Sequence, residues 1–288
     1  MAKLFRRKAV ETATMDAAEN AIANKEVEGL SQRQIVIKRF IHHRAAMIAL
    51  FSLILITVIV NTALEFKIGP WKIHGWWKYK VTDIPELRYK ECPGQVIGCP
   101  TLKLFPPSLG EHPFGQDDIG RDYLALVMRG AQRSLMVAFV IGVLGGVIGT
   151  IVGAISGFYR GIVDSVLMRF VDFVITVPAI IIGSVIGYRY GNLGAGFLAI
   201  YLGLFSWTGL SRLVRGEFLK LREMEFVDAA RVAGASNRRI IFKHILPNAV
   251  GIIIVSVTLL MSSAILLETA LSYIGFGVVA PDVSLGLL

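Results

Sequence analysis

Five apolar runs organise the sequence, and polar or charged segments separate them. Each run approaches or exceeds the ~20 residues that cross the hydrocarbon core of a bilayer. Because lipid cannot satisfy an open backbone, each run is predicted to be helical. The predicted spans cover residues 45–64, 135–155, 170–186, 194–210 and 249–271. The pattern predicts an all-α integral membrane protein, a helical bundle of about five spans, with a kink at Pro178.

Basic residues indicate the orientation of the spans. The first run follows a basic cluster, made up of Arg33, Lys38, Arg39 and Arg44. The positive-inside rule then places the amino terminus in the cytosol. The expected organisation is a cytosolic segment with an interfacial helix at 1–44, a first transmembrane helix at 45–66, an extracytoplasmic segment at 67–133, and a transmembrane core at 134–288 with a cytosolic loop at 212–247. No apolar stretch follows the first charges, so a cleaved signal peptide is not expected.

The predicted extracytoplasmic segment contains both cysteines of the chain, Cys92 and Cys99. A disulfide is permitted outside the cytosol, and closing so short a loop is worth roughly 2–3 kcal/mol in the chain-entropy model. The two residues are therefore a candidate disulfide. Two free thiols are the alternative.

Glycine recurs at every fourth residue through the second span and beyond it, at Gly145, Gly149, Gly153, Gly157 and Gly161. On a helix this spacing forms a ridge without side chains, which lets a second helix approach closely in lipid. We interpret the ridge as a packing surface and not as a binding site.

A charged segment at 225–248 lies between the last two apolar runs and is too hydrophilic to lie in a bilayer. A short helix is predicted from Phe226 to Val232, and Gly234 is expected to end it in the left-handed conformation. Ser236 is expected to cap a second helix, which runs to Pro247, where the last apolar run begins. The segment therefore predicts a small helical hairpin on the surface of a membrane protein.

Composition agrees with a membrane protein. The chain has 288 residues, of which 54% are hydrophobic and 18% are charged, whereas a soluble domain carries nearer a quarter charged residues. The formal net charge of +9 raises the question of nucleic acid. Because the basic residues concentrate at span ends and in one loop, membrane orientation explains them better, and we expect no nucleic-acid partner.

The sequence lacks the motifs of a catalytic protein. No Gly-Lys-Ser or Gly-Lys-Thr occurs, so no Walker-type phosphate loop is present. No cysteine–histidine cluster has metal-ligand spacing, and no Ser-His-Asp set converges on a water-exposed site. We expect no catalytic, cofactor or metal site in this chain.

The hairpin segment resembles the EAA loop, which in permease subunits of binding-protein-dependent ABC importers docks into a cytosolic ATPase subunit. The resemblance rests on three features in order along the chain: Asp228-Ala-Ala, Gly234 and Leu246-Pro247. Asp228 replaces the usual Glu, and His244 stands where an Ile is common. The resemblance implies that ATPase coupling is carried by Glu225, Asp228, Ala229, Ala230, Arg231, Gly234, Ala235, Leu246 and Pro247.

A second segment, at 112–122, indicates which type of permease subunit the chain resembles. His112-Pro-Phe-Gly-Gln-Asp-Asp-Ile-Gly-Arg-Asp122 is similar to the segment before the second span of the C-type permease subunit in dipeptide and oligopeptide importers, with departures at Phe114, Gln116 and Ile119. Taken by itself, Asp117 or Asp118 is predicted to cap a helix.

Membership of that family implies a type I ABC importer permease working by alternating access in the cell inner membrane. The implied partners are a homologous permease subunit, a cytosolic ATPase that binds ATP and Mg²⁺, and an extracytoplasmic substrate-binding protein. The implied cargo is a peptide, although related permeases take nickel chelates or glutathione. The family has a sixth span returning to the cytosol, which is expected but missing after Pro281.

Two other classes of function remain as alternatives. A self-powered secondary transporter or channel would bury ionisable residues along its path and often shows two related halves. Glu268 is the one acid deep in an apolar run, and no internal repeat is visible. Glu268 either contacts substrate or makes a helix–helix hydrogen bond, and the second role is favoured. A membrane scaffold whose hairpin recruits a partner is the third interpretation.

Overall fold

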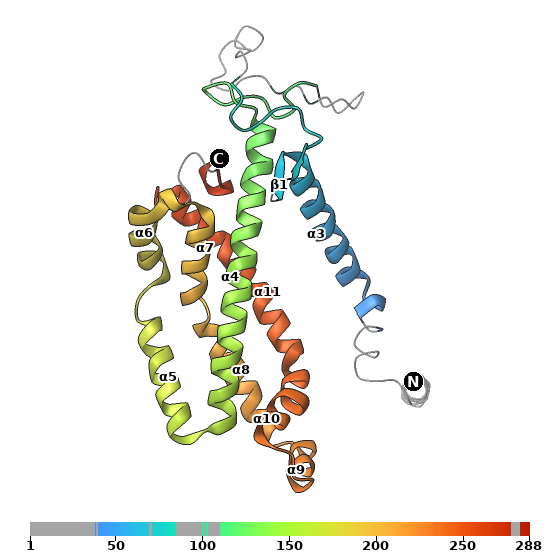
Figure 1. The fold of residues 1–288 in the computed structure, drawn as a ribbon, viewed down its shortest axis with the longest axis vertical. Helices are drawn as coiled ribbons and strands as arrows, with labels where there is room; N and C mark the ends of the chain where they lie inside the picture. Colours follow the sequence, from blue (N-terminus) through green and yellow to red (C-terminus); the bar gives the residue numbers. More distant parts are fainter. Residues whose placement is uncertain are drawn as a thin grey trace, which may run out of the picture. The chain divides into compact units, whose positions relative to one another are not determined.

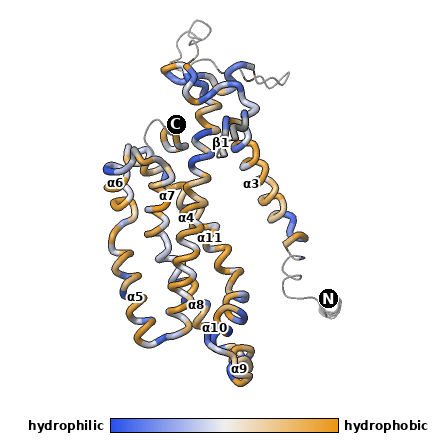
Figure 2. The backbone as a smooth tube through the Cα atoms, in the orientation of Figure 1, coloured by the Kyte–Doolittle hydropathy of each residue, from blue (hydrophilic) through white to orange (hydrophobic). Residues whose placement is uncertain are grey.

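The computed structural model describes residues 38, 40–68, 71–84, 100, 102, 110–277 and 283–288. Within this part of the chain the helices dominate (Figure 1). The chain divides into two compact units, Met1–Val58 and Ile59–Leu288, and each is described by itself. Apolar residues follow the long helices, whereas hydrophilic residues gather at helix ends and in connecting segments (Figure 2).

The described part of the first unit consists mainly of helix α3, Arg44–Ala63, whose last turn belongs to the second unit. The helix has 20 residues and is long and apolar enough to cross a membrane. Most of its large apolar side chains are exposed, among them Ile48, Phe51 and Ile54. Such a surface suits a lipid environment. The predicted first span is confirmed as an apolar helix.

A short antiparallel hairpin follows α3, with strands β1, Phe66–Ile68, and β2, Trp71–Ile73. This hairpin was not predicted from the sequence. Each strand has only three residues, which is too short for an alternating pattern to stand out. Gly69-Pro70, which separates the strands in the sequence, is a common turn pair.

Helix α4, Tyr123–Tyr159, is the central helix of the second unit. It packs against α7, Ala195–Phe205, α8, Thr208–Arg222, and α11, Leu246–Tyr273. With 37 residues it is much longer than the predicted span at 135–155. Most of the extension lies at the amino-terminal end, because the helix starts at the polar motif and not at the first apolar residue.

The glycine ridge of α4 packs against α8, as expected. A Cβ added to Gly149 would lie 2.8 Å from the Trp207 carbonyl oxygen, and one added to Gly153 would lie 2.5 Å from the Ser211 carbonyl oxygen. Gly161 does not belong to the ridge, contrary to the prediction. It is the first residue after the break that ends α4, with φ +59°, and an added Cβ would meet no packing neighbour within 4 Å.

Two of the predicted spans are bent pairs of helices. Helices α5, Gly161–Ile175, and α6, Ala179–Tyr190, meet at 63°, with Pro178 at the start of α6. The predicted kink is therefore confirmed, since a proline cannot supply the N–H that continues the helix. The pair α7–α8 bends by 41° at residues 206–207, a break that the uninterrupted apolar run did not indicate.

In the described residues, three helices are long and apolar enough to cross a membrane, and counting each bent pair as one span raises the number to five. The three are α3, α4 and the continuous helix Asn237–Tyr273, which includes α11. This agrees with the expected bundle of about five spans.

Candidate functional site

The predicted hairpin is present as helix α9, Glu225–Val232, followed by α10, Asn237–Arg239. We call residues 225–247 the knuckle; Figure 1 shows α9 and α10 beside each other at one end of the bundle. Two acids lie in the first turn of α9 and Arg231 lies in its last turn, which is the arrangement that the helix dipole favours. Arg231 Nη1 also donates to Asp228 Oδ1 at 2.8 Å.

The turn of the knuckle is fixed by backbone hydrogen bonds. Gly234 has φ +77°. The Ala235 N–H donates to the Ala230 carbonyl at 3.0 Å, and the Gly234 N–H donates to the Arg231 carbonyl at 2.9 Å. This pair of bonds is a Schellman motif, which requires a left-handed residue where the glycine stands. The predicted roles of Gly234 and of Ser236, whose side chain accepts from the Arg239 N–H, are both confirmed.

The second helix does not stop at Pro247, contrary to the prediction. The chain passes through a π-helical turn, Ile240–Ile245, directly into α11. Within this turn the Leu246 N–H donates to the Ile241 carbonyl, five residues back. The wider turn gives the proline ring room beside the preceding turn, where a regular α-helix would bring a carbonyl into contact with it. The knuckle is therefore continuous with the last long helix.

The inner face of the knuckle is packed into a hydrophobic cluster. Val227 and Ala230 of α9 are buried, and so are Ile240 and Ile245 of the π-helical turn. They lie in one cluster with residues of α4 and α8, including Phe218. Because this contact is apolar and closely packed, the knuckle is held firmly against the bundle.

A set of ion pairs fixes the turn between α4 and α5 to α8, next to the knuckle. Asp164 of α5 makes a two-pronged contact with Arg215 of α8, through Nε–Oδ1 and Nη2–Oδ2 distances of 2.6 Å each. The Ser156 hydroxyl donates to the same carboxylate. Arg160 pairs with Glu223 at 2.7 Å just before α9 begins. Bidentate charged contacts of this kind hold a definite geometry.

The pairing of Asp164 with Arg215 was not predicted from the sequence, in which the two residues lie 51 positions apart. The available signal was weak. Opposite charges occur at the expected cytosolic ends of two neighbouring spans, but the sequence does not say which residues face each other.

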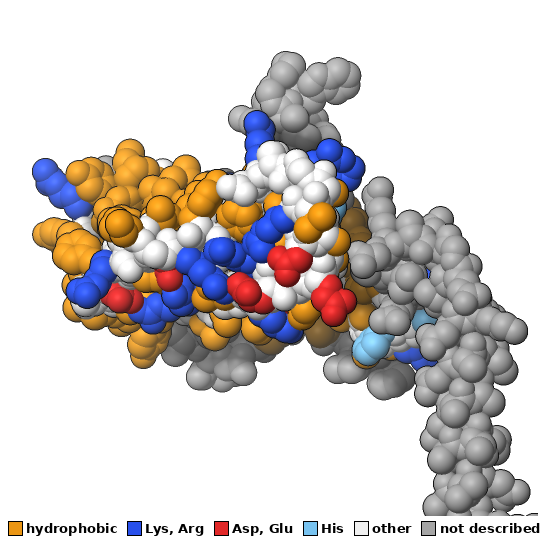
Figure 3. Space-filling model, turned by 90° about the horizontal axis from the view of Figure 1, so that it is seen from below, with side chains coloured by type: hydrophobic (Ala, Val, Ile, Leu, Met, Phe, Trp, Pro, Cys, Tyr) orange, Lys and Arg blue, Asp and Glu red, His pale blue; other side chains and the backbone are white. Residues whose placement is uncertain are grey.

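The outer face of the knuckle is exposed and chemically mixed. Val232 is 91% exposed and Phe226 is 39% exposed. Figure 3, which views the molecule from this end, shows basic, acidic and hydrophobic side chains interspersed over the surface. Exposed apolar side chains rimmed by charges are typical of a protein contact surface.

The motif at 112–122 forms a closed structure at the start of α4. The cap of α4 is Asp122, and not Asp117 or Asp118 as predicted. Its buried carboxylate accepts from the Ala125 N–H, and it lies 2.8 Å from both Trp77 Nε1 and His112 Nδ1. Asp117 instead accepts from the backbone N–H of Arg121 and pairs with its side chain. Asp117 therefore closes the turn that precedes the cap.

Glu268 of α11 is 0% exposed. It accepts hydrogen bonds from Ser134 of α4 at 3.0 Å and from Ser272 at 2.8 Å. Ser284 continues the chain of hydroxyls to Ser272 at 3.0 Å. These contacts agree with the helix–helix role that was favoured for this carboxylate. Cys92 and Cys99 lie outside the described residues.

Comparison with known proteins decides the family. The family described as "Binding-protein-dependent transport system inner membrane component" matches residues 149–288, which include the knuckle and α11. The oligopeptide transport system permease protein OppC of Mycobacterium tuberculosis H37Rv is 36% identical over 262 residues, covering 91% of this chain and 81% of that protein. The protein of the same name from Escherichia coli K12 is 37% identical over 274 residues, covering 95% and 82%.

The chain belongs to the family of ABC-importer permeases, in its oligopeptide-type branch. This ABC permease is a multi-pass membrane protein and, like its family, a transport component rather than an enzyme. The resemblance inferred from the hairpin and from the 112–122 motif is confirmed.

Proposed function

We propose that this ABC permease is the transmembrane subunit of an ATP-driven importer of peptides and forms half of the translocation path. The names of its relatives support the cargo class, and the family match supports binding-protein-dependent transport. The observation that carries the mechanism is the structure of the knuckle. Its inner face is packed against the bundle, its outer face is exposed, and its last turn continues into α11.

In this mechanism the outer face of the knuckle docks against a cytosolic ATPase subunit. The coupling residues are those of the EAA-like loop: Glu225, Asp228, Ala229, Ala230, Arg231, Gly234, Ala235, Leu246 and Pro247. Closure of two ATPase subunits on ATP and Mg²⁺ moves the knuckle. The apolar cluster beneath it and the Asp164–Arg215 pair pass the movement to α4, α8 and α11, because packed elements move as units.

The remaining partners complete the importer. A homologous permease subunit supplies the other half of the path, and an extracytoplasmic substrate-binding protein delivers the peptide. The amino terminus lies in the cytosol, on the same side as the knuckle, as the basic residues before the first span favour.

Purification of the assembled importer from membranes tests the coupling role. In the variant Ala230→Asp with Gly234→Pro, the new carboxylate enters the apolar cluster and proline cannot adopt φ +77°. We expect the ATPase subunit to be lost from the purified complex, by roughly tenfold or more, because the docking element is deformed. Membrane insertion of the variant is checked by its yield in the membrane fraction.

A second variant separates docking from folding. Val232→Asp changes a 91% exposed side chain, so the fold of the knuckle is retained while its contact surface becomes acidic. We expect reduced ATPase association in this variant, whereas Arg189→Gln at the end of α6 leaves it unchanged. Unaltered association in both knuckle variants contradicts the coupling role, and peptide uptake without an ATPase favours a self-powered carrier.

A further inference from the structure

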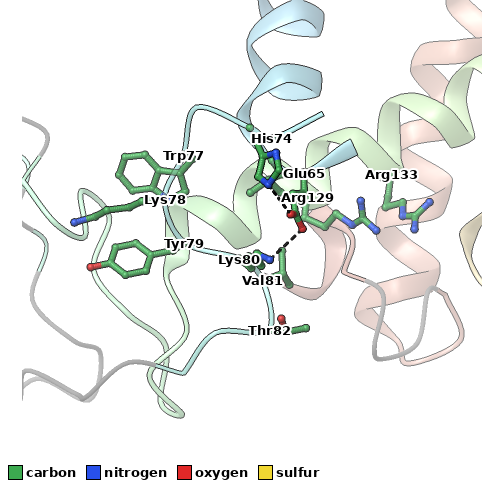
Figure 4. Close-up of a pocket in the computed structure, with 12 residues that line it drawn as sticks. Glu65, His74, Trp77, Lys78, Tyr79, Lys80, Val81, Thr82, Arg129 and Arg133 are labelled. Atoms are coloured by element: carbon green, nitrogen blue, oxygen red, sulfur yellow. Dashed lines mark ion pairs between the residues drawn. The ribbon is translucent and has the colours of Figure 1, made fainter. Parts of the chain in front are cut away.

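A basic groove lies at the amino-terminal end of α4 (Figure 4). The knuckle packs against the other end of this helix, at Ala154 and Phe158. Its volume is about 750 Å³, which is within the usual range for small-molecule sites. Residues of α4, the two residues after α3 and the segment after β2 line it. The described lining residues carry more positive than negative charge: one carboxylate, Glu65, and four cations, Lys78, Lys80, Arg129 and Arg133.

The cations of the groove come from two segments, α4 and the residues after β2. Arg129 and Arg133 lie one turn apart on α4 and so share a face of the helix. In the same groove, Lys80 Nζ is 3.1 Å from Glu65 Oε2, and His74 Nε2 is 3.7 Å from Glu65 Oε1. A guanidinium carries five N–H donors in a fixed planar arrangement, and Arg129 Nη1 gives one of them to Gln132 Oε1 at 3.2 Å. The groove therefore suits a small anion with several oxygen acceptors.

The walls of the groove are held in place by neighbouring contacts. Gln132 Nε2 donates to the Val60 carbonyl in the last turn of α3 at 2.7 Å. Leu64 and Ala125 pack together in a small apolar cluster, with Trp77 against it. The Trp77 indole N–H donates to the Asp122 cap at 2.8 Å. The groove is thus formed by positioned residues and does not depend on the ligand for its shape.

The position of the groove indicates where its ligand comes from. It begins at Leu64, where the apolar run of α3 ends, and reaches Arg133, two residues before the apolar run of α4 begins. Trp77 and Tyr79 border it, and aromatic residues of this kind concentrate at the boundary between lipid and water. Its cationic side chains therefore lie at headgroup depth.

The groove also lies outside the packed interior of the bundle. Farther along, α4 packs against other helices: Gly142 of α4 lies against Met261 of α11, and Leu144 of α4 lies against Gly203 of α7. Arg129 and Arg133 lie instead on the part of α4 that contacts the end of α3 through Gln132. The groove is therefore separate from the interfaces that α4 makes with α7 and α11.

We propose that this basic groove binds the phosphate of an anionic phospholipid, in the leaflet reached by the end of α3 and the start of α4. The arginines of α4 hold the phosphate oxygens, and Lys80 and Lys78 lie toward the polar part of the headgroup. Anionic lipid attracts basic residues at this depth, and each basic residue adds to the attraction.

Native mass spectrometry of the intact protein, released from nanodiscs with equal phosphatidylglycerol and phosphatidylcholine, tests this proposal. We expect phosphatidylglycerol to be retained in preference to phosphatidylcholine. The variant Arg129→Gln with Arg133→Gln is expected to retain about thirty-fold less phosphatidylglycerol, given about tenfold for each 1.4 kcal/mol and about 1 kcal/mol for each charge.

Two further variants separate charge from folding. Arg129→Lys with Arg133→Lys keeps both charges and is expected to retain the lipid preference. Arg189→Gln removes an exposed charge from the end of α6, outside the groove, and is expected to behave as the wild type. Equal retention of the two lipids by the wild type, or equal phosphatidylglycerol retention by the Gln variant, overturns the proposal. Displacement of the lipid by excess inorganic phosphate or by a peptide with a free carboxylate also overturns it, in favour of a soluble ligand.

Discussion

Replacing Gly153 by alanine is expected to destabilise the bundle by about 1–3 kcal/mol, the usual cost of overpacking a closely packed contact. The added Cβ would lie 2.5 Å from the Ser211 carbonyl oxygen and 2.8 Å from Val214 Cβ. The first of these is backbone of α8 and cannot rotate away, so the two helices must separate. Gly153→Leu is expected to prevent folding, because the larger side chain would overlap with the same atoms of α8. Thermal unfolding in detergent, followed by tryptophan fluorescence, measures the change.

Gly216→Ala is the matched control. Gly216 lies in α8, and a Cβ there meets nothing within 4 Å. Because alanine is the better helix former, this change is expected to leave stability unchanged or to raise it by up to about 1 kcal/mol. Equal effects of the two substitutions would mean that α4 and α8 do not approach each other along the glycine ridge.

Replacing Asp122 by alanine is expected to cost about 3–5 kcal/mol. The carboxylate is 0% exposed and serves three partners: the Ala125 N–H, the Trp77 indole and His112. Each buried polar group left without its partner costs about 1–3 kcal/mol, and loss of a helix cap typically costs about 1 kcal/mol. The measurement is again thermal unfolding, together with limited proteolysis of the segment before α4.

Asp118→Ala is the control for this prediction, since Asp118 is exposed in the same motif. Its effect is expected to stay within about 1 kcal/mol. Asp122→Asn is expected to fall between the two, because the amide oxygen still caps the helix while the charge is lost. A stability of Asp122→Ala equal to that of Asp118→Ala would show that the motif does not fasten the start of α4.

Local rules predicted the knuckle well. Gly234 and Ser236 have roles that follow from a few neighbouring residues, namely a left-handed turn and a helix cap, and both were identified from sequence. Apolar run length likewise predicted α3 and the number of candidate spans. The proline in the third span predicted the break before α6 for the same local reason.

The errors arose where a local rule had more than one solution. Pro247 was expected to separate two helices, but a π-helical turn accommodates it within one. Three aspartates stand near the start of α4, and tertiary contacts with Trp77 and His112 select Asp122 as the cap. The Asp164–Arg215 pair joins residues from different spans, so only the folded bundle reveals it.

Photocrosslinking in the assembled importer tests whether the knuckle contacts a nucleotide-hydrolysing partner, as we propose. A photoreactive amino acid is placed at Val232, 91% exposed on α9, or at Tyr188, 81% exposed on α6 at the other end of the bundle (Figure 1). Mass spectrometry identifies the adducts. We expect an adduct with the ATPase subunit from position 232 and none from position 188. A complex that hydrolyses ATP and transports peptide, yet yields no ATPase adduct at position 232, would contradict the proposal.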